Sequence, residues 1–307
     1  MAKSKISKEA KKRFKRRIRP KTAGATRFYI MQDRVFEYFA LTCTFIGIIT
    51  LGFLLYNIFS TGWERLSLDF IMNPISGRPE RSGILAAWSG TLWLMGLTAL
   101  FALPIGIATA IYLEEYERRS RFASLIEINI SNLAGVPSII YGLLGLEIFV
   151  RVMGMGESIL AGSLTLALLI LPIIVVSTRE SLRTVPKTIR EASYALGASK
   201  WQTIWRQVLP ASVAGIFTGV ILALSRAIGE SAPLIVVGAL AYVKHPPSWV
   251  NDEFTALPIQ IFNWVSMPKE GFKINAAAGI IVLLFITFLM NGIAVYLRHR
   301  WQKKIKW

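Results

Sequence analysis

Long apolar runs constrain the fold of this chain more than any other feature of its sequence. A run of about 18 or more apolar residues can cross the roughly 30 Å hydrocarbon core of a membrane as a helix. Hydrophobic residues make up 53% of the 307 residues and charged residues only 17%, whereas soluble domains hold about 25% charged residues. The sequence therefore predicts an all-α integral membrane protein with six transmembrane helices, at 39–59, 85–113, 125–150, 159–176, 211–243 and 276–297.

The positive charges predict how these helices are oriented. Loops rich in Lys and Arg remain on the cytoplasmic side of a membrane. Of the 35 Lys and Arg residues, 27 lie before the first run, between runs two and three, between runs four and five, or after the sixth run, and the other three loops hold seven. This split predicts a multi-pass protein with both termini in the cytoplasm. We expect a basic cytoplasmic N-terminal extension at 1–34 and a transmembrane domain at 35–307.

The basic extension also raises the question of nucleic-acid binding. The formal net charge is +17, and Lys and Arg are concentrated between Lys3 and Lys21. Clustered cations can neutralise phosphates, and such binding would weaken steeply with salt. The same residues suffice as an orientation signal that also binds anionic lipid. We favour this second interpretation and expect a lipid membrane, and no nucleic acid, as the partner.

The residues that catalysis or metal binding would need are scarce. Cys43 is the single cysteine and lies inside the first apolar run, which excludes a disulfide framework and a thiolate metal site. His245 and His299 are too few and too far apart for a His-based metal site. No GxxxxGK[ST] phosphate loop occurs, so this chain does not hydrolyse ATP through that motif. We expect no catalytic residue and no cofactor in this chain.

The segment between the fourth and fifth runs, about 178–210, contains the most specific motif. It resembles the Glu-Ala-Ala loop of binding-protein-dependent ABC importer permeases, which reads Glu-Ala-Ala, three residues, Gly, nine residues, an aliphatic residue, any residue, Leu-Pro. The resemblance implies that this loop couples the permease to an ATPase. The matching positions are Glu191, Ala192, Gly197, Leu209 and Pro210.

The residues of this loop are typical of a docking element. The spacing predicts a short amphipathic helix at 187–196, a turn at Gly197 and a second short helix towards Pro210. Two positions depart from the family pattern: Ser193 replaces the second alanine, and Gln207 replaces the aliphatic residue. An ordinary basic linker helix is the alternative interpretation, which the spacing of five matching positions makes less favourable.

Further stretches narrow the resemblance. Segments 133–143 and 225–234 resemble the phosphate-specific importer permeases, and segments 111–116 and 255–261 resemble the PstA-type subunit rather than its PstC-type companion. The resemblance extends from about residue 78 to the C-terminus.

This resemblance implies a type I ABC importer permease in a prokaryotic cell membrane, one half of a phosphate pathway. It further implies a PstC-type second permease, a dimer of PstB-type cytoplasmic ATPases that bind ATP and Mg²⁺, and an extracytoplasmic PstS-type phosphate-binding protein. Three alternatives stay open: a permease for another oxyanion such as sulfate or phosphonate, a stand-alone ion-coupled transporter, and a membrane-anchored nucleic-acid-binding protein.

The fifth run contains a charged pair at membrane depth. Such charges are costly unless they face protein or water, so they suggest function. Arg226 and Glu230 are four residues apart, which places them on one helix face, and the guanidinium fork suits phosphate oxygens. We assign the pair to the phosphate pathway together with Ser225 and Ser231. A purely structural ion pair is the alternative.

A ridge of small residues follows the same run. Residues of this kind recur every fourth position and let two helix backbones approach closely. The ridge consists of Ala211, Gly215, Gly219, Ala223, Ala227 and Ser231.

Overall fold

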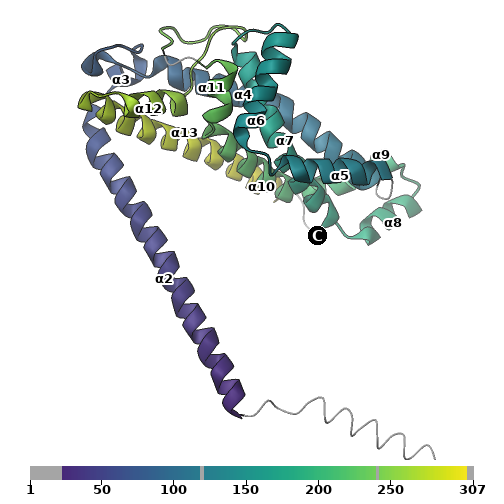
Figure 1. The fold of residues 1–307 in the computed structure, drawn as a ribbon. Helices are drawn as coiled ribbons and strands as arrows, with labels where there is room; N and C mark the ends of the chain where they lie inside the picture. Colours follow the sequence, from purple (N-terminus) through teal and green to yellow (C-terminus); the bar gives the residue numbers. More distant parts are fainter. Residues whose placement is uncertain (1–22, 118–120, 240–241, 303–307) are drawn as a thin grey trace, which may run out of the picture. The chain divides into compact units, whose positions relative to one another are not determined.

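A computed structural model describes residues 23–117, 121–239 and 242–302 (Figure 1). Residues 1–22 of the predicted N-terminal extension lie outside these ranges. The chain divides into two units, 1–57 and 58–307, and each is described by itself. All the regular elements in the described ranges are helical, as the sequence predicts. The first unit contains most of α2 (Ala23–Gly62), whose apolar side chains surround the helix axis as in a lipid-facing span.

The second unit combines four long helices with short helical segments. The long helices are α4 (Leu85–Ile111), α7 (Ile159–Arg183), α10 (Leu209–Ile228) and α13 (Glu270–Gln302). The short α-helices are α3 (Leu68–Met72), α5 (Arg121–Leu133), α6 (Ser138–Gly145), α8 (Lys187–Ala195), α9 (Lys200–Thr203), α11 (Ala232–Val237) and α12 (Leu257–Ser266). The remaining segments are the 3-10 turns η1 (Trp63–Arg65) and η2 (Pro79–Arg81) and the π-helical turns η3 (Tyr112–Tyr116), η4 (Leu146–Val152) and η5 (Ile204–Val208).

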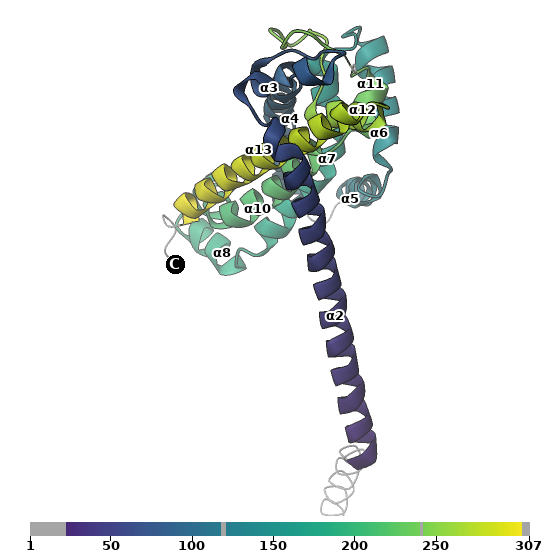
Figure 2. The same ribbon diagram turned by 90° about the vertical axis from the view of Figure 1, so that its left-hand side faces the viewer.

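Helix α7 forms the centre of the second unit. It packs against α4 on one side and α10 on the other, and α10 in turn packs against α13 (Figures 1 and 2). Small residues make these contacts close. A Cβ added to Gly215 or Gly219 would collide with Ser181 or Ser177 of α7, so these two glycines allow α10 to approach α7. The predicted packing role of the ridge is confirmed at these positions.

Five helical stretches among the described residues are long and apolar enough to span a membrane. They are Phe28–Arg65, Leu85–Tyr116, Ile159–Arg183, Lys200–Ile228 and Glu270–Trp301. The predicted runs one, two, four and six each fall within or largely within one of these stretches. The prediction of one continuous helix at the third run, 125–150, is wrong, because this run is broken into α5, α6 and η4.

The predicted fifth run, 211–243, is also wrong in its limits. The helix begins at Lys200 and ends at Ile228, and α11 follows after a break at 229–231. The second helix of the Glu-Ala-Ala loop is therefore continuous with the spanning helix and is not a separate element.

Proline together with glycine explains both breaks. A proline ring clashes with the carbonyl four residues earlier, and Pro137 and Pro233 stand four residues after Leu133 and Gly229. Helix α5 ends at Leu133, whose carbonyl instead accepts a hydrogen bond of 2.8 Å from the hydroxyl of Tyr141. The broken helices then meet, since Gly142 of α6 lies against the backbone of Pro233.

The loops that the charge pattern assigns to the two sides gather at opposite ends of the second unit. At one end, Arg65 donates to Asn275 of α13 and to backbone carbonyls of the 79–82 segment. At the other end, Arg183 and Arg190 pair with Glu114 and Glu115. Figure 1 shows α3 and α12 at the first end and α8 and α9 at the second.

Candidate functional site

Helix α8 forms the predicted first helix of the Glu-Ala-Ala loop, with bounds one residue shorter than expected. Pro186 precedes its first turn, which suits the fixed φ of proline. One side of the helix faces the protein, where Arg190 is buried and Ile189 packs against the apolar cluster of Leu182, Val185 and Val208, and the other side exposes Lys187 and Glu191. The prediction of a short amphipathic helix is confirmed.

Gly197 ends α8 in a left-handed turn with φ +82°. The amide of Gly197 donates to the carbonyl of Tyr194 at 2.9 Å, and the amide of Ala198 donates to the carbonyl of Ser193 at 3.2 Å. These two bonds form a Schellman motif, which satisfies the last carbonyls of a helix and favours glycine at this position. An added Cβ would meet no atom within 4 Å, so the backbone conformation alone requires glycine.

The second half of the loop begins with a capping box. The Ser199 hydroxyl accepts from the amide of Gln202, and the Gln202 side chain accepts from the amide of Ser199 at 2.9 Å. The two halves are joined by a 2.8 Å hydrogen bond between the hydroxyls of Ser193 and Thr203. Serine at the second alanine position of the motif therefore holds the loop together, which an alanine would not do.

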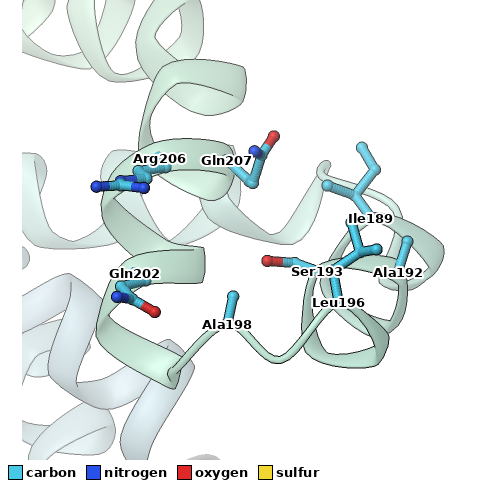
Figure 3. Close-up of a pocket in the computed structure, with 8 residues that line it drawn as sticks. All are labelled: Ile189, Ala192, Ser193, Leu196, Ala198, Gln202, Arg206 and Gln207. Carbon is cyan, nitrogen blue, oxygen red and sulfur yellow. The ribbon is translucent and has the colours of Figure 1, made fainter.

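A groove of about 450 Å³ lies between α8 and the helix that starts at Lys200. Figure 3 shows Ser193 pointing from α8 towards the facing helix, which contributes Gln202, Arg206 and Gln207. Leu196, which lines the groove at the tip of the loop, is 90% exposed.

The motif residues of the loop divide into an outer and an inner group. Glu191, Ala192 and Gly197 are exposed. Leu209 packs against the same apolar cluster as Ile189, and Pro210 occupies the first turn of α10. The inner group thus joins α8 to the spanning helix α10, while the outer group faces away from the protein.

A cluster of arginine and glutamate side chains, which sequence reasoning missed, lies behind α8. Its members are Glu114, Glu115, Glu127, Arg179, Arg183 and Arg190, and Glu180 also pairs with Arg183, at 2.9 Å. Four carboxylates therefore face three guanidinium groups, and every one of these charges has an opposite partner. Removing one partner of a buried pair of this kind typically costs about 3–5 kcal/mol.

Arg190 is the member of the cluster that belongs to α8. Its Nη2 lies 2.6 Å from Oε1 of Glu115, and its Nη1 and Nη2 also donate to the carbonyls of Val185 and Leu182 at 2.8 and 3.0 Å. Both side chains are less than a tenth exposed. Arg190 therefore ties α8 to the end of α7 and to η3, which continues α4.

The predicted anion site lies where α10 ends. Nε of Arg226 is 3.4 Å from Oε1 of Glu230, with 41% of the arginine and 18% of the glutamate side chain exposed. The pair forms, although Glu230 stands in the break after the helix and not on a shared helix face. The Ser225 hydroxyl donates to Asn291 of α13 at 2.8 Å, and Ser231 precedes α11.

The structure brings together Arg226 with Glu230 and Ser225 with Asn291. Asn291, a polar residue of α13 that was not predicted, thus contacts one of the four residues assigned to the pathway. A polar residue inside an apolar run was the signal that could have found it. Among the described residues, no group of three or more His, Cys, Asp and Glu side chains is placed to hold a metal ion.

Comparisons with known proteins agree with this architecture. Residues 102–303 match the family model described as binding-protein-dependent transport system inner membrane component. The phosphate transport system permease protein PstA 1 of Mycobacterium tuberculosis is 31% identical over 272 residues, which cover 87% of this chain and 89% of that protein. The phosphate transport system permease protein PstA of Haemophilus influenzae is 34% identical over 257 residues, covering 83% and 90%.

A solved structure agrees in its fold. An inward-facing conformation of the MetNI methionine ABC transporter superposes with a TM-score of 0.57 at 16% identity, over 71% of this chain and 95% of the matched chain. The apolar helices and this likeness define a multi-pass membrane protein with the fold of type I ABC importer permeases. Because the family model matches residues 102–303, which is more than half of this chain, the chain belongs to the binding-protein-dependent transport system inner membrane components.

Proposed function

We propose that this chain is a non-catalytic permease subunit of an ATP-driven importer of inorganic phosphate and forms half of the translocation pathway. The observation that carries the proposal is the similarity to phosphate transport system permeases over more than four-fifths of the chain. The partners would be a PstC-type second permease, a PstS-type extracytoplasmic binding protein and a dimer of PstB-type ATPases that bind ATP and Mg²⁺.

In this proposal the ATPase docks on α8. The exposed side chains of Glu191 and Leu196 offer one charge and one apolar contact, and the tight turn at Gly197 keeps the tip of the loop narrow. Leu209 and Pro210 then connect this surface to α10. The shared packing of Ile189 and Leu209 on one cluster supports transmission of ATPase movement into the membrane.

The phosphate pathway would pass Arg226, Glu230, Ser225 and Ser231. Arg298, the first cation of the basic C-terminal segment, donates from α13 to Thr218 of α10 at 3.1 Å. Thr218 therefore lies at the depth along α10 where the basic C-terminal segment begins. Arg226 lies eight residues further along α10, about 12 Å at 1.5 Å per residue, so it would stand near the middle of a 30 Å core. Its partly exposed guanidinium can donate to an anion, and Glu230 would hold it between transport cycles.

The charge split supports a topology with both termini in the cytoplasm, with 1–34 as the basic extension and 35–307 as the permease domain. The gathering of the basic loops around α8 supports the same sidedness.

Co-purification tests the proposal. An ATPase and a second permease should accompany the tagged chain from its native membrane, and phosphate with a binding protein should stimulate ATP hydrolysis by the complex. If the chain purifies alone and moves phosphate into vesicles without an ATPase, it is a stand-alone ion-coupled transporter and the proposal is wrong.

The pathway residues have a separate test. Radiolabelled phosphate uptake is measured for Arg226→Gln, Glu230→Gln and the double variant, each checked for assembly. Loss of uptake in all three supports a pathway role, because the guanidinium donors are missing or misplaced. Near-normal uptake by the assembled double variant would mean that the pair only packs the helices, and the pathway would have to lie elsewhere.

A further inference from the structure

The buried pair of Glu115 and Arg190 lies outside the motif residues and outside the proposed anion pathway. Arg190 precedes the motif glutamate by one residue, and Glu115 belongs to η3, 75 residues earlier in the chain. Nε and Nη2 of Arg190 both reach the same carboxylate, at 3.1 and 2.6 Å. Both nitrogens donate to Oε1, and Nε also reaches Oε2 at 3.4 Å, so these contacts constrain the orientation of the two side chains as well as their separation.

The contacts of α8 show which elements the Glu115–Arg190 pair connects. The main contacts of this helix are with α9 and η5, which belong to the same loop, and the side chain of Arg190 reaches further, to Glu115 of η3, which continues α4. The same guanidinium holds the last carbonyls of α7, from Leu182 and Val185. Arg190 therefore fixes α8 against the cytoplasmic ends of two spanning helices, beside the apolar cluster on which Ile189 of α8 and Ile111 of α4 both pack.

The surroundings of Glu115 make the pair rigid. Its neighbour Glu114 is 1% exposed and pairs with Arg183 at 3.0 Å, so η3 is held from two directions. Both carboxylates point into the protein from a π-helical turn, and such turns are frequent at functional sites. Any movement of α8 that keeps the Glu115–Arg190 pair intact must displace the end of α4 as well.

We propose that Glu115 is a positioning residue for energy coupling: through Arg190 it makes α8 and the end of α4 move as one body when the ATPase moves α8. This inference rests on the proposed function, because it assumes that α8 receives the ATPase. The motif residues Leu209 and Pro210 connect α8 to α10 alone. Through Glu115, α4 would take part in the same conformational change.

The first experiment measures transport and ATP hydrolysis in the complete complex in vesicles. Glu115→Gln, Arg190→Gln and the double variant are compared with Glu147→Gln, which removes an exposed pair with Arg151. We expect each single variant to lower phosphate uptake per ATP hydrolysed about tenfold, and the double variant to lower it by about the same factor and not a hundredfold, since residues that act as one unit are not additive. Glu147→Gln should match the native chain.

The second measurement keeps the proposal testable if transport is lost through poor assembly. Spin labels at Thr188→Cys in α8 and Ala108→Cys in α4, both exposed sites, are introduced with Cys43→Ser. The native pair should give a narrow distance distribution that stays narrow with and without ATP, and Glu115→Gln should broaden it at least twofold. These distances need no phosphate, so their outcome is independent of which anion the importer carries.

The distance distribution and the uptake per ATP together decide whether Glu115 has this role. Broadened distances together with a lowered uptake per ATP support the proposal. An unchanged distance distribution in Glu115→Gln, or an uptake per ATP equal to that of the native complex, would overturn it. If the native complex moves a different anion, the proposed function fails while the distance measurement still tests the role of Glu115.

Discussion

Replacing Gly197 by alanine should weaken ATPase binding by a factor set by the geometry of the turn. Gly197 has φ +82°, and an added Cβ would meet no atom within 4 Å, so the change has a backbone cost and no steric cost in this chain. The left-handed region costs an L-residue roughly 1–2 kcal/mol. The alanine variant can relieve this strain by opening the turn, and ATPase binding must then close the turn again. The affinity for the ATPase therefore falls about 5- to 30-fold, since about 1.4 kcal/mol corresponds to a factor of ten.

Two further substitutions at this position separate strain from obstruction. Gly197→Asn should lose less affinity than alanine, because asparagine tolerates the left-handed region better than other side chains. Gly197→Trp should lose more, since its ring would occupy the open space that we assign to the ATPase surface. The assay is a titration of purified ATPase against the permease complex in nanodiscs, with stimulated ATP hydrolysis as a second readout.

Gly154 supplies the matched control. It also has a positive φ, +65°, with no atom within 4 Å of an added Cβ, and it precedes the opposite end of α7. Gly154→Ala therefore carries the same backbone strain away from the docking surface, and ATPase affinity should not change. Equal affinities for native Gly197 and its alanine variant, or equal losses at Gly197 and Gly154, would refute the reasoning.

The remaining predictions concern the loop, the helix packing and the topology. Ser193→Ala should leave the buried hydroxyl of Thr203 without its partner and lower the stability of the loop by about 1 kcal/mol, measurable as faster amide exchange in α8. Gly219→Leu should prevent assembly of the permease, because its side chain would occupy the place of Ser177, and size-exclusion chromatography would detect the loss. A reporter fused after the last residue should be cytoplasmic and one inserted near Trp249 external; the reverse result would contradict the assigned topology.

Local features of the sequence predicted the first helix of the Glu-Ala-Ala loop and its end almost to the residue. The helix at 187–196 is observed as α8, and its end at Gly197 follows from the conformational freedom of glycine. Such features are determined within a few residues of chain, so a single sequence contains what is needed to predict them. The long apolar runs were predicted for the same reason.

The breaks in the third and fifth runs were harder to predict because proline alone does not decide them. Pro104 and Pro172 lie inside the continuous helices α4 and α7, whereas Pro137 and Pro233 end a helix four residues earlier. Only the latter two have a glycine within the preceding four residues, and glycine lowers the helix propensity of the segment further. Hydropathy averages over such positions and so predicted one continuous span where the structure has two helices.

The pairing of Glu115 with Arg190 was beyond sequence reasoning for a different reason. Sequence spacing identifies candidate ion pairs three or four residues apart in the chain, and Arg226 and Glu230 do pair, although not on one helix. It gives no partner at a separation of 75 residues. The available signal was weaker. Glu114 and Glu115 directly follow the second apolar run, whereas the other segments that the charge pattern assigns to the cytoplasmic side are rich in Lys and Arg.

Selectivity of transport in the reconstituted complex is the most direct test of the proposed phosphate import. The permease, its companion, the ATPases and the binding protein are placed in vesicles, and uptake of radiolabelled phosphate is measured with ATP and an excess of unlabelled sulfate or phosphonate. We predict uptake that needs ATP, that unlabelled phosphate competes away and that sulfate and phosphonate leave intact. Uptake that persists without ATP, or that sulfate or phosphonate abolishes while phosphate does not, would contradict this prediction.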